Sequence, residues 1–172
     1  MQFKKVYPVI LAFVLVAVAC GPKEKKVEKD EKQTSIPIVD FSGIEPLLAY
    51  ENDTTYIINF WATWCAPCVK ELPYLEQIAN DYKDEKLKVI LVNLDFPNHY
   101  ETRLLPFIEQ NQISSKVIML DDPDANSWID KVDTSWSGSI PATLVYNKWK
   151  REFFEKEFSQ SELEEIVKQY IN

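Results

Sequence analysis

A strand-like run, a pair of cysteines and a helical pattern follow one another without a break in the middle of the chain. Residues 56–60 are apolar and rich in β-branched and aromatic side chains, which predicts a buried strand. Across residues 72–79, apolar side chains recur at helical spacing. Cys65 and Cys68 therefore stand where a strand passes into a helix. This order constrains the chain to an α/β fold.

The two cysteines have the spacing of a reversible dithiol. Three residues apart at a helix start, they lie one turn from each other and can form a disulfide. Unpaired N–H groups and the positive dipole end there favour a thiolate. We therefore expect the outer sulfur, Cys65, to have a lowered pKa and to be the nucleophile. Pro67 fits the first turn, where its missing N–H costs little.

Two other uses of the cysteine pair are possible. A structural zinc site needs four ligands, whereas the chain offers only one further cysteine, Cys20, and one histidine, His99. An inert disulfide would suit an oxidising compartment, but it would not require a tryptophan and a proline at a strand-to-helix turn. The Cys-X-X-Cys pattern after a strand favours redox chemistry, with no metal and no cofactor.

The N-terminal residues predict export. Positive residues precede an apolar run at 6–19, which is short for a membrane span and suited to a signal peptide. Ala17 and Ala19 form a site for ordinary cleavage before Cys20. The same segment resembles a bacterial lipobox, in which the cysteine is lipidated. We expect a signal peptide at 1–19 and a lipid anchor at Cys20; an uncleaved anchor helix would also leave the domain outside the cytoplasm.

A charged segment separates this N-terminus from the rest of the chain. Residues 20–35 lack the apolar side chains needed for a core, which predicts a disordered tether; a solvated helix is the alternative. Residues 36–172 are enough for one domain. The formal net charge of -8 disfavours binding to nucleic acid, and three glycines leave no dinucleotide fingerprint. We expect a monomer.

Strand and helix patterns alternate along this domain. Apolar runs predict strands, and periodic segments predict helices, with a capping box at 159–162. The expected strands are 36–41, 56–60, 88–94, 116–120, 142–146 and 152–155. The expected helices lie near 44–50, 68–82, 100–110 and 124–131, and from 159 onward. This pattern predicts an α/β three-layer sandwich with a mixed central sheet.

Two motifs resemble the thioredoxin superfamily, most closely its exported TlpA/ResA-like branch. They are FWATWCAPC at 60–68 and SIPAT at 139–143, and the resemblance extends from about residue 36 onward. It implies that Cys65 attacks a substrate disulfide and that Cys68 resolves the mixed disulfide. Residues 114–131 resemble the central insertion of that branch.

The resemblance also implies a substrate groove. Pro141 matches a cis-proline that presents the backbone of the preceding residue, Ile140, to the substrate. A trans proline opening an edge strand is the alternative. The groove would be completed by Trp64, Ala66 and Pro67, with the Trp64 ring as an aromatic docking surface.

Asn59 departs from typical thioredoxins, which carry a buried aspartate there as a base. Asparagine cannot act as a base. The TlpA/ResA-like branch often has asparagine at this place and a glutamate three residues after the second cysteine, which is Glu71 here. One turn from Cys68, Glu71 is expected to exchange protons with the thiols. The alternative is a solvated glutamate favoured by the positive end of the helix.

The sequence therefore predicts an exported, lipid-anchored thiol–disulfide oxidoreductase of the cell envelope or periplasm. The resemblance implies reduction of partner protein disulfides, often in cytochrome c maturation, with electrons from a membrane thiol donor. One alternative is a peroxiredoxin-like thiol peroxidase, although Thr63 has the wrong spacing to Cys65, and Arg103 and Arg151 have no assigned place. A second is a non-catalytic binding module that uses the groove around Trp64.

Overall fold

One six-stranded mixed sheet forms the centre of the protein. The computed structural model describes residues 1–2 and 35–171. The strands follow the order β1-β4-β3-β2-β5-β6. Strands β1 to β4 run parallel to one another, whereas β5 is antiparallel to both β2 and β6. Their bounds are β1 Ile38–Val39, β2 Thr55–Trp61, β3 Leu87–Asn93, β4 Lys116–Leu120, β5 Ala142–Tyr146 and β6 Arg151–Phe154. The predicted mixed sheet is confirmed.

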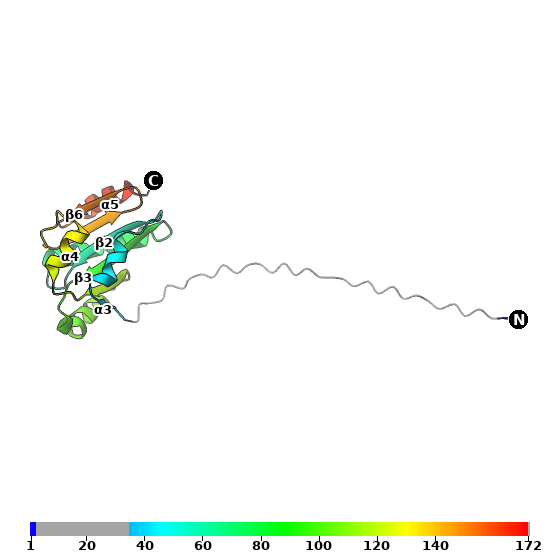
Figure 1. Cartoon of the computed structure of the whole chain (residues 1–172), viewed down its shortest axis with the longest axis horizontal. Coiled ribbons are helices and arrows are strands. Elements are labelled where there is room, and N and C mark those ends of the chain that lie inside the picture. Colours follow the sequence, from blue (N-terminus) through cyan, green and yellow to red (C-terminus); the bar gives the residue numbers. More distant parts are fainter. Residues whose placement is uncertain (3–34, 172) are drawn as a thin grey trace. The chain divides into compact units, whose positions relative to one another are not determined.

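Helices cover both faces of this sheet, which gives three layers (Figure 1). The α-helices are α1 Phe41–Ile44, α2 Ala66–Asp81, α3 Leu105–Gln110, α4 Ala125–Val132 and α5 Gln160–Lys168. Shorter turns are the 3-10 helices η1 Glu45–Leu48 and η2 Pro97–His99 and the π-helix η3 Tyr100–Leu104. One core lies under α2 and α5, and the other lies under α1, η1 and α4.

Strand β2 contributes side chains to both cores. All seven of its residues are buried, and alternate side chains point to opposite faces. Ile57 and Trp61 belong to the core under α2, whereas Ile58 and Phe60 belong to the core under α4. The buried run that the sequence predicted as a central strand is confirmed.

Several element boundaries differ from those expected. Helix α2 begins at Ala66 rather than Cys68, because the Cys65 side chain accepts a hydrogen bond from the Cys68 N–H and acts as its N-cap. The helix expected at 44–50 is two short pieces, α1 and η1. The capping box between Ser159 and Glu162 is present as predicted.

Two side chains without an assigned role are structural. Trp128 is buried and stacks on Phe41, with ring centroids 5.7 Å apart. Arg151 donates hydrogen bonds to the carbonyl oxygens of Leu48 (2.6 Å) and Val132 (2.7 Å). Arg151 thereby satisfies carbonyl groups at the ends of η1 and α4.

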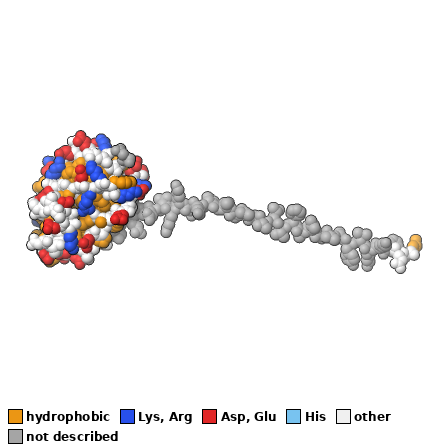
Figure 2. Space-filling model, turned by 45° about the horizontal axis from the view of Figure 1, so that its top comes forward, with side chains coloured by type: hydrophobic (Ala, Val, Ile, Leu, Met, Phe, Trp, Pro, Cys, Tyr) orange, Lys and Arg blue, Asp and Glu red, His pale blue; other side chains and the backbone are white. Residues whose placement is uncertain are grey.

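Most of the N-terminal features lie outside the described residues. These are the predicted signal peptide, Cys20 and nearly all of the charged tether. Within the described residues, no helix is long and apolar enough to cross a membrane. That part of the chain also holds no group of three or more side chains suited to a metal ion. The face seen in Figure 2 carries acidic and basic side chains interspersed, without a continuous basic stripe.

Candidate functional site

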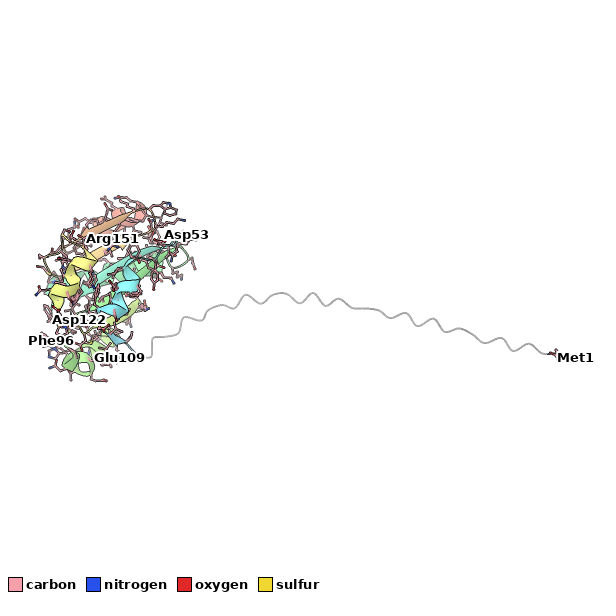
Figure 3. The ribbon with its side chains drawn as sticks, viewed as in Figure 1. Met1, Asp53, Phe96, Glu109, Asp122 and Arg151 are labelled. Carbon is pink, nitrogen blue, oxygen red and sulfur yellow. A yellow bond between two sulfur atoms is a disulfide. The ribbon has the colours of Figure 1, made fainter. Side chains whose placement is uncertain are left out.

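The cysteine pair lies where the two central parallel strands end. Strand β2 pairs with β3 in register from Thr55 to Trp61, so the carboxyl ends of both strands meet at one edge. Figure 3 shows Asp53, just before β2, and Phe96, just after β3, at opposite ends of the domain. In open α/β sheets, ligand sites form at the carboxyl ends of strands. The cysteines follow β2 at this end.

Cys65 and Cys68 form a disulfide, with their Cα atoms 5.2 Å apart. The N–H of Cys68 points at the Cys65 sulfur at an N···S distance of 3.3 Å. Cys65 retains 6% exposure, whereas Cys68 is fully buried. The structure thus has an outer and an inner sulfur, with a backbone donor and a helix N-terminus directed at the outer one.

The Ile140–Pro141 segment lies against the outer sulfur. Its peptide bond is cis, and the Ile140 carbonyl oxygen lies 3.7 Å from the Cys65 sulfur. The buried Trp136 indole donates a hydrogen bond to the Ser139 carbonyl oxygen at 2.8 Å. Trp136 therefore supports the segment from behind. Its ring packs in the core under α4, 4.8 Å from the ring of Phe60 between centroids.

The remaining predicted groove residues surround this contact. Trp64 is 52% exposed, and Ala66 and Pro67 are also exposed. Ile140 is half-buried between them and the core. The two motifs, more than 70 residues apart in the sequence, are brought together around one sulfur. An exposed aromatic ring thus lies next to a nearly buried sulfur.

Glu71 is buried, with 1% of its surface exposed, so the alternative of a solvated glutamate is wrong. One carboxyl oxygen accepts from the Asn59 amide, and the other accepts from the Phe158 N–H, both at 2.8 Å. Burial raises the pKa of Glu71 to about 7, although the two hydrogen bonds oppose the shift. No hydrogen bond joins Glu71 to either sulfur in the described part of the chain. Proton exchange with the thiols stays a prediction.

Asp95 was not predicted, and it helps to hold the turn that precedes Cys65. Its side chain is 2% exposed and accepts a hydrogen bond from the Thr63 N–H at 3.0 Å. Thr63 lies two residues before Cys65, so this bond fixes the path of the chain into the disulfide. The available signal was the position of Asp95 directly after the strand next to β2.

Comparison with known proteins places the chain in a family. The sequence profile of the AhpC/TSA family matches residues 43–150, a range that contains both cysteines and Pro141. The chain belongs to the AhpC/TSA family.

Curated relatives of this AhpC/TSA-family chain include thiol-disulfide oxidoreductases named ResA. The protein from Bacillus thuringiensis subsp. konkukian is 32% identical over 42% of each chain. The one from Halalkalibacterium halodurans is 25% identical over 69% of this chain and 62% of its own length. The chain therefore spans from under half to under two thirds of these relatives. A thioredoxin from Rickettsia typhi is 32% identical over 47% of this chain and 84% of its own.

Solved structures confirm the thioredoxin-like fold. A thiol:disulfide interchange protein of the thioredoxin family from Chlorobium tepidum TLS has a TM-score of 0.58 at 21% identity, covering 70% of this chain and 81% of that one. StoA from Bacillus subtilis has a TM-score of 0.53 at 21% identity, covering 68% and 84%. At these identities the likeness establishes the architecture of the family member described here.

Proposed function

We propose that the protein is a thiol–disulfide oxidoreductase that acts on protein disulfides. The single observation that carries the proposal is the Cys65–Cys68 disulfide at the start of α2, with the cis Ile140–Pro141 segment against its outer sulfur. A merely structural disulfide does not need this exposed aromatic and backbone surface. The names of the curated relatives support the same chemistry.

In the reducing direction the mechanism has two exchange steps. The Cys65 thiolate attacks one sulfur of the partner disulfide, forming a mixed disulfide and releasing the other partner sulfur as a thiolate. The Cys68 thiolate then attacks the Cys65 sulfur, closes the internal disulfide and releases the partner in its dithiol form. Two electrons pass to the partner. The Cys68 N–H and the helix N-terminus stabilise the attacking thiolate.

Glu71 supplies the proton step of this proposal. Cys68 must lose its proton before the second attack, and both Cys68 and Glu71 are shielded from bulk water. A carboxyl group with a pKa of about 7 can accept and return a proton near neutral pH. The side chains lie one helical turn apart on α2, which allows direct or water-mediated transfer. Glu71 would thus replace the buried aspartate of typical thioredoxins.

The cellular setting belongs to the same proposal. Export and a lipid anchor at Cys20 would place the domain in the cell envelope or periplasm, as a monomer on a charged tether. There it would receive electrons from a membrane thiol donor and reduce selected cysteine pairs, with apocytochrome c as one substrate class. The support is the N-terminal sequence and the TlpA/ResA-like motifs.

The test is capture of the mixed disulfide. In the Cys68→Ala variant the first exchange step remains and the second is removed, so partner proteins should accumulate as covalent adducts of Cys65 in the native host. The double variant Cys65→Ser/Cys68→Ala is the matched control and should capture nothing. Mass spectrometry identifies the adducts, and insulin-disulfide reduction by the wild type gives a direct rate.

Three results would count against the proposal. Insulin reduction that survives Cys65→Ser would remove the nucleophile from the mechanism. Absence of insulin reduction in the wild type, together with absence of adducts in Cys68→Ala, would favour a binding module. Peroxide consumption by the wild type would favour a peroxidase, although Arg151 is already held by Leu48 and Val132.

A further inference from the structure

A shallow, open groove of about 550 Å³ lies beside Trp64. Thr63 and Trp64 form one side, and Arg103, Phe107 and Gln110, from η3 and α3, form the other. Trp64 directly precedes the nucleophile, so a partner segment in this groove would lie a few residues from the attacked disulfide. The groove is separate from the Ile140–Pro141 contact, since none of its lining residues comes from that segment.

Arg103 gives the groove its charge. Its side chain is exposed and forms no ion pair or hydrogen bond among the described residues. The other lining residues are polar or apolar and neutral, and none is a carboxylate. Glu101 and Glu109 lie on the same helices but do not line the groove. The chain therefore presents one free guanidinium beside its nucleophile, although its formal net charge is -8.

The local backbone gives this arginine a fixed place. Arg103 lies in η3, a π-helical turn, and such turns are rare and frequent at functional sites. The next residue, Leu104, is fully buried in the core under α2, which anchors the turn against the domain. A guanidinium on an anchored turn suits bidentate recognition of a carboxylate.

We propose that this groove is a specificity site for acidic partner segments, in which Arg103 pairs with an aspartate or glutamate close to the partner's reactive cysteine. The inference rests on the proposed function and names its substrate class. Opposite charge steers the encounter and selects the partner, and the neighbouring Trp64 ring covers the apolar part of the segment. Although the protein is acidic overall, the positive charge of Arg103 determines the preference for acidic segments at this groove.

The test uses two homodimeric peptide disulfides. Each peptide has one cysteine flanked on both sides by aspartates, or by asparagines at the same positions. The reduced full chain reacts with each peptide, the reaction is quenched with acid, and chromatography separates the reduced peptide from the disulfide. The initial rates then give the aspartate-to-asparagine rate ratio. The rates at which dithiothreitol reduces the same peptides give the intrinsic reactivity ratio of the two peptides. The ratio measured with the protein is divided by this intrinsic ratio. The variants are Arg103→Gln and Lys83→Gln. Lys83 follows α2, a 16-residue helix that begins after Cys65, so this control charge lies roughly 24 Å from Cys65 along the helix.

The wild type should prefer the aspartate peptide, and Arg103→Gln should lower that preference about two- to fivefold, the range of an exposed ion pair. Lys83→Gln should leave it unchanged, and about 0.5 M salt should weaken it in the wild type. Equal ratios in the wild type and Arg103→Gln would overturn the specificity site while leaving the proposed function intact. A wild type that reduces neither peptide would instead contradict the proposed function, and the inference with it.

Discussion

The Asn59 side chain can form a hydrogen bond with Glu71 whether the Glu71 carboxyl is ionised or protonated. With Glu71 ionised, the Asn59 amide nitrogen donates both to Glu71 and to the Thr143 hydroxyl. The Asn59 carbonyl oxygen is buried and has no partner in this arrangement. If the amide turns over, that oxygen can accept from a protonated Glu71 and from the Thr143 hydroxyl. The turned amide thus pairs with a protonated Glu71, but its NH2 group then takes the position of an oxygen that has no hydrogen-bond partner.

This pair predicts a pH-dependent loss of stability. Unfolded, Glu71 ionises near pH 4.5, whereas in the folded protein burial raises its pKa to about 7. The folded state thus holds the proton more tightly, and the free energy of unfolding falls as the pH rises from 4.5 through 7, by about 3 kcal/mol at most. Glu71→Gln should remove this loss. Denaturant unfolding of the disulfide form at pH 5 and pH 8 measures the difference.

The glutamine variant has the shape of Glu71; its oxygen can accept from the Phe158 N–H, and its amide can donate to the oxygen of a turned Asn59. Glu165→Gln, an exposed glutamate of α5, is the matched control and should follow the wild type. A pH dependence that is unchanged in Glu71→Gln would show that the carboxyl ionises freely in the folded protein.

Among individual site residues, the sequence predicted those that belong to short motifs. Cys65, Cys68 and Pro141 were read from short segments with characteristic spacing. Phe158, whose N–H holds Glu71, could not be predicted in the same way, because the two residues are 87 positions apart and the contact depends on how α5 docks. Backbone donors leave no residue-specific pattern in a sequence.

Among the elements, α5 offers a direct test of local stability. The Ser159 hydroxyl and the Glu162 N–H and carboxylate form the capping box, and Leu163 and Val167 pack into the core. Ser159→Ala should lower the free energy of unfolding by about 1 kcal/mol, because it leaves a helix N–H without its acceptor. Thermal or urea unfolding measures the change.

The control for this prediction is Glu165→Ala, an exposed position on the same helix. It should have little effect, since alanine and glutamate have similar helix propensities. An equal loss in both variants would point to the helix as a whole instead of its cap. Because Phe158 directly precedes the cap, Ser159→Ala also tests how firmly the Glu71 contact is held.

Helices and strands were predictable where periodicity was strong, as in β2, β3 and α5. Their ends were less predictable, because capping by a side chain decides them. A cysteine is an unusual N-cap, so the start of α2 was placed too late. The π-helical η3 also gives no distinct sequence pattern, although it carries Arg103.

For the whole molecule, the N-terminus makes a prediction about processing. If the chain is a lipoprotein, expression of the full sequence in a bacterial host should give a membrane-bound product that begins at Cys20 and carries a lipid. Mass spectrometry of the purified product reads both the new terminus and the added mass. Cys20→Ser should abolish the lipid and release the domain from the membrane.

Two outcomes would contradict lipidation while keeping export. Cleavage before an unmodified Cys20 would indicate an ordinary signal peptide. An uncleaved product would indicate an anchor helix, and Cys20→Ser would then leave membrane attachment unchanged. In each case the thioredoxin-like domain is unaffected, because it is built from residues that follow the charged segment.

The alternation of strands and helices in the sequence predicted the layers of the domain. It did not predict the order of the strands in the sheet. Strand β4 lies between β1 and β3, although β1 comes first in the chain and β4 follows β3 by more than 20 residues. Apolar patterns show that a strand is buried, but they do not identify its neighbours. The sheet order depends on pairing between distant segments.

The position of β2 between β3 and β5 has a consequence for how the molecule opens. Proteins unfold locally in cooperative units, and edge strands separate at a lower free energy than central ones. Strands β1 and β6 can detach from their single neighbours without breaking any hydrogen bond of β2. The Cys65–Cys68 pair lies just beyond β2, so opening at either edge of the sheet leaves the strand that precedes this pair hydrogen-bonded on both sides.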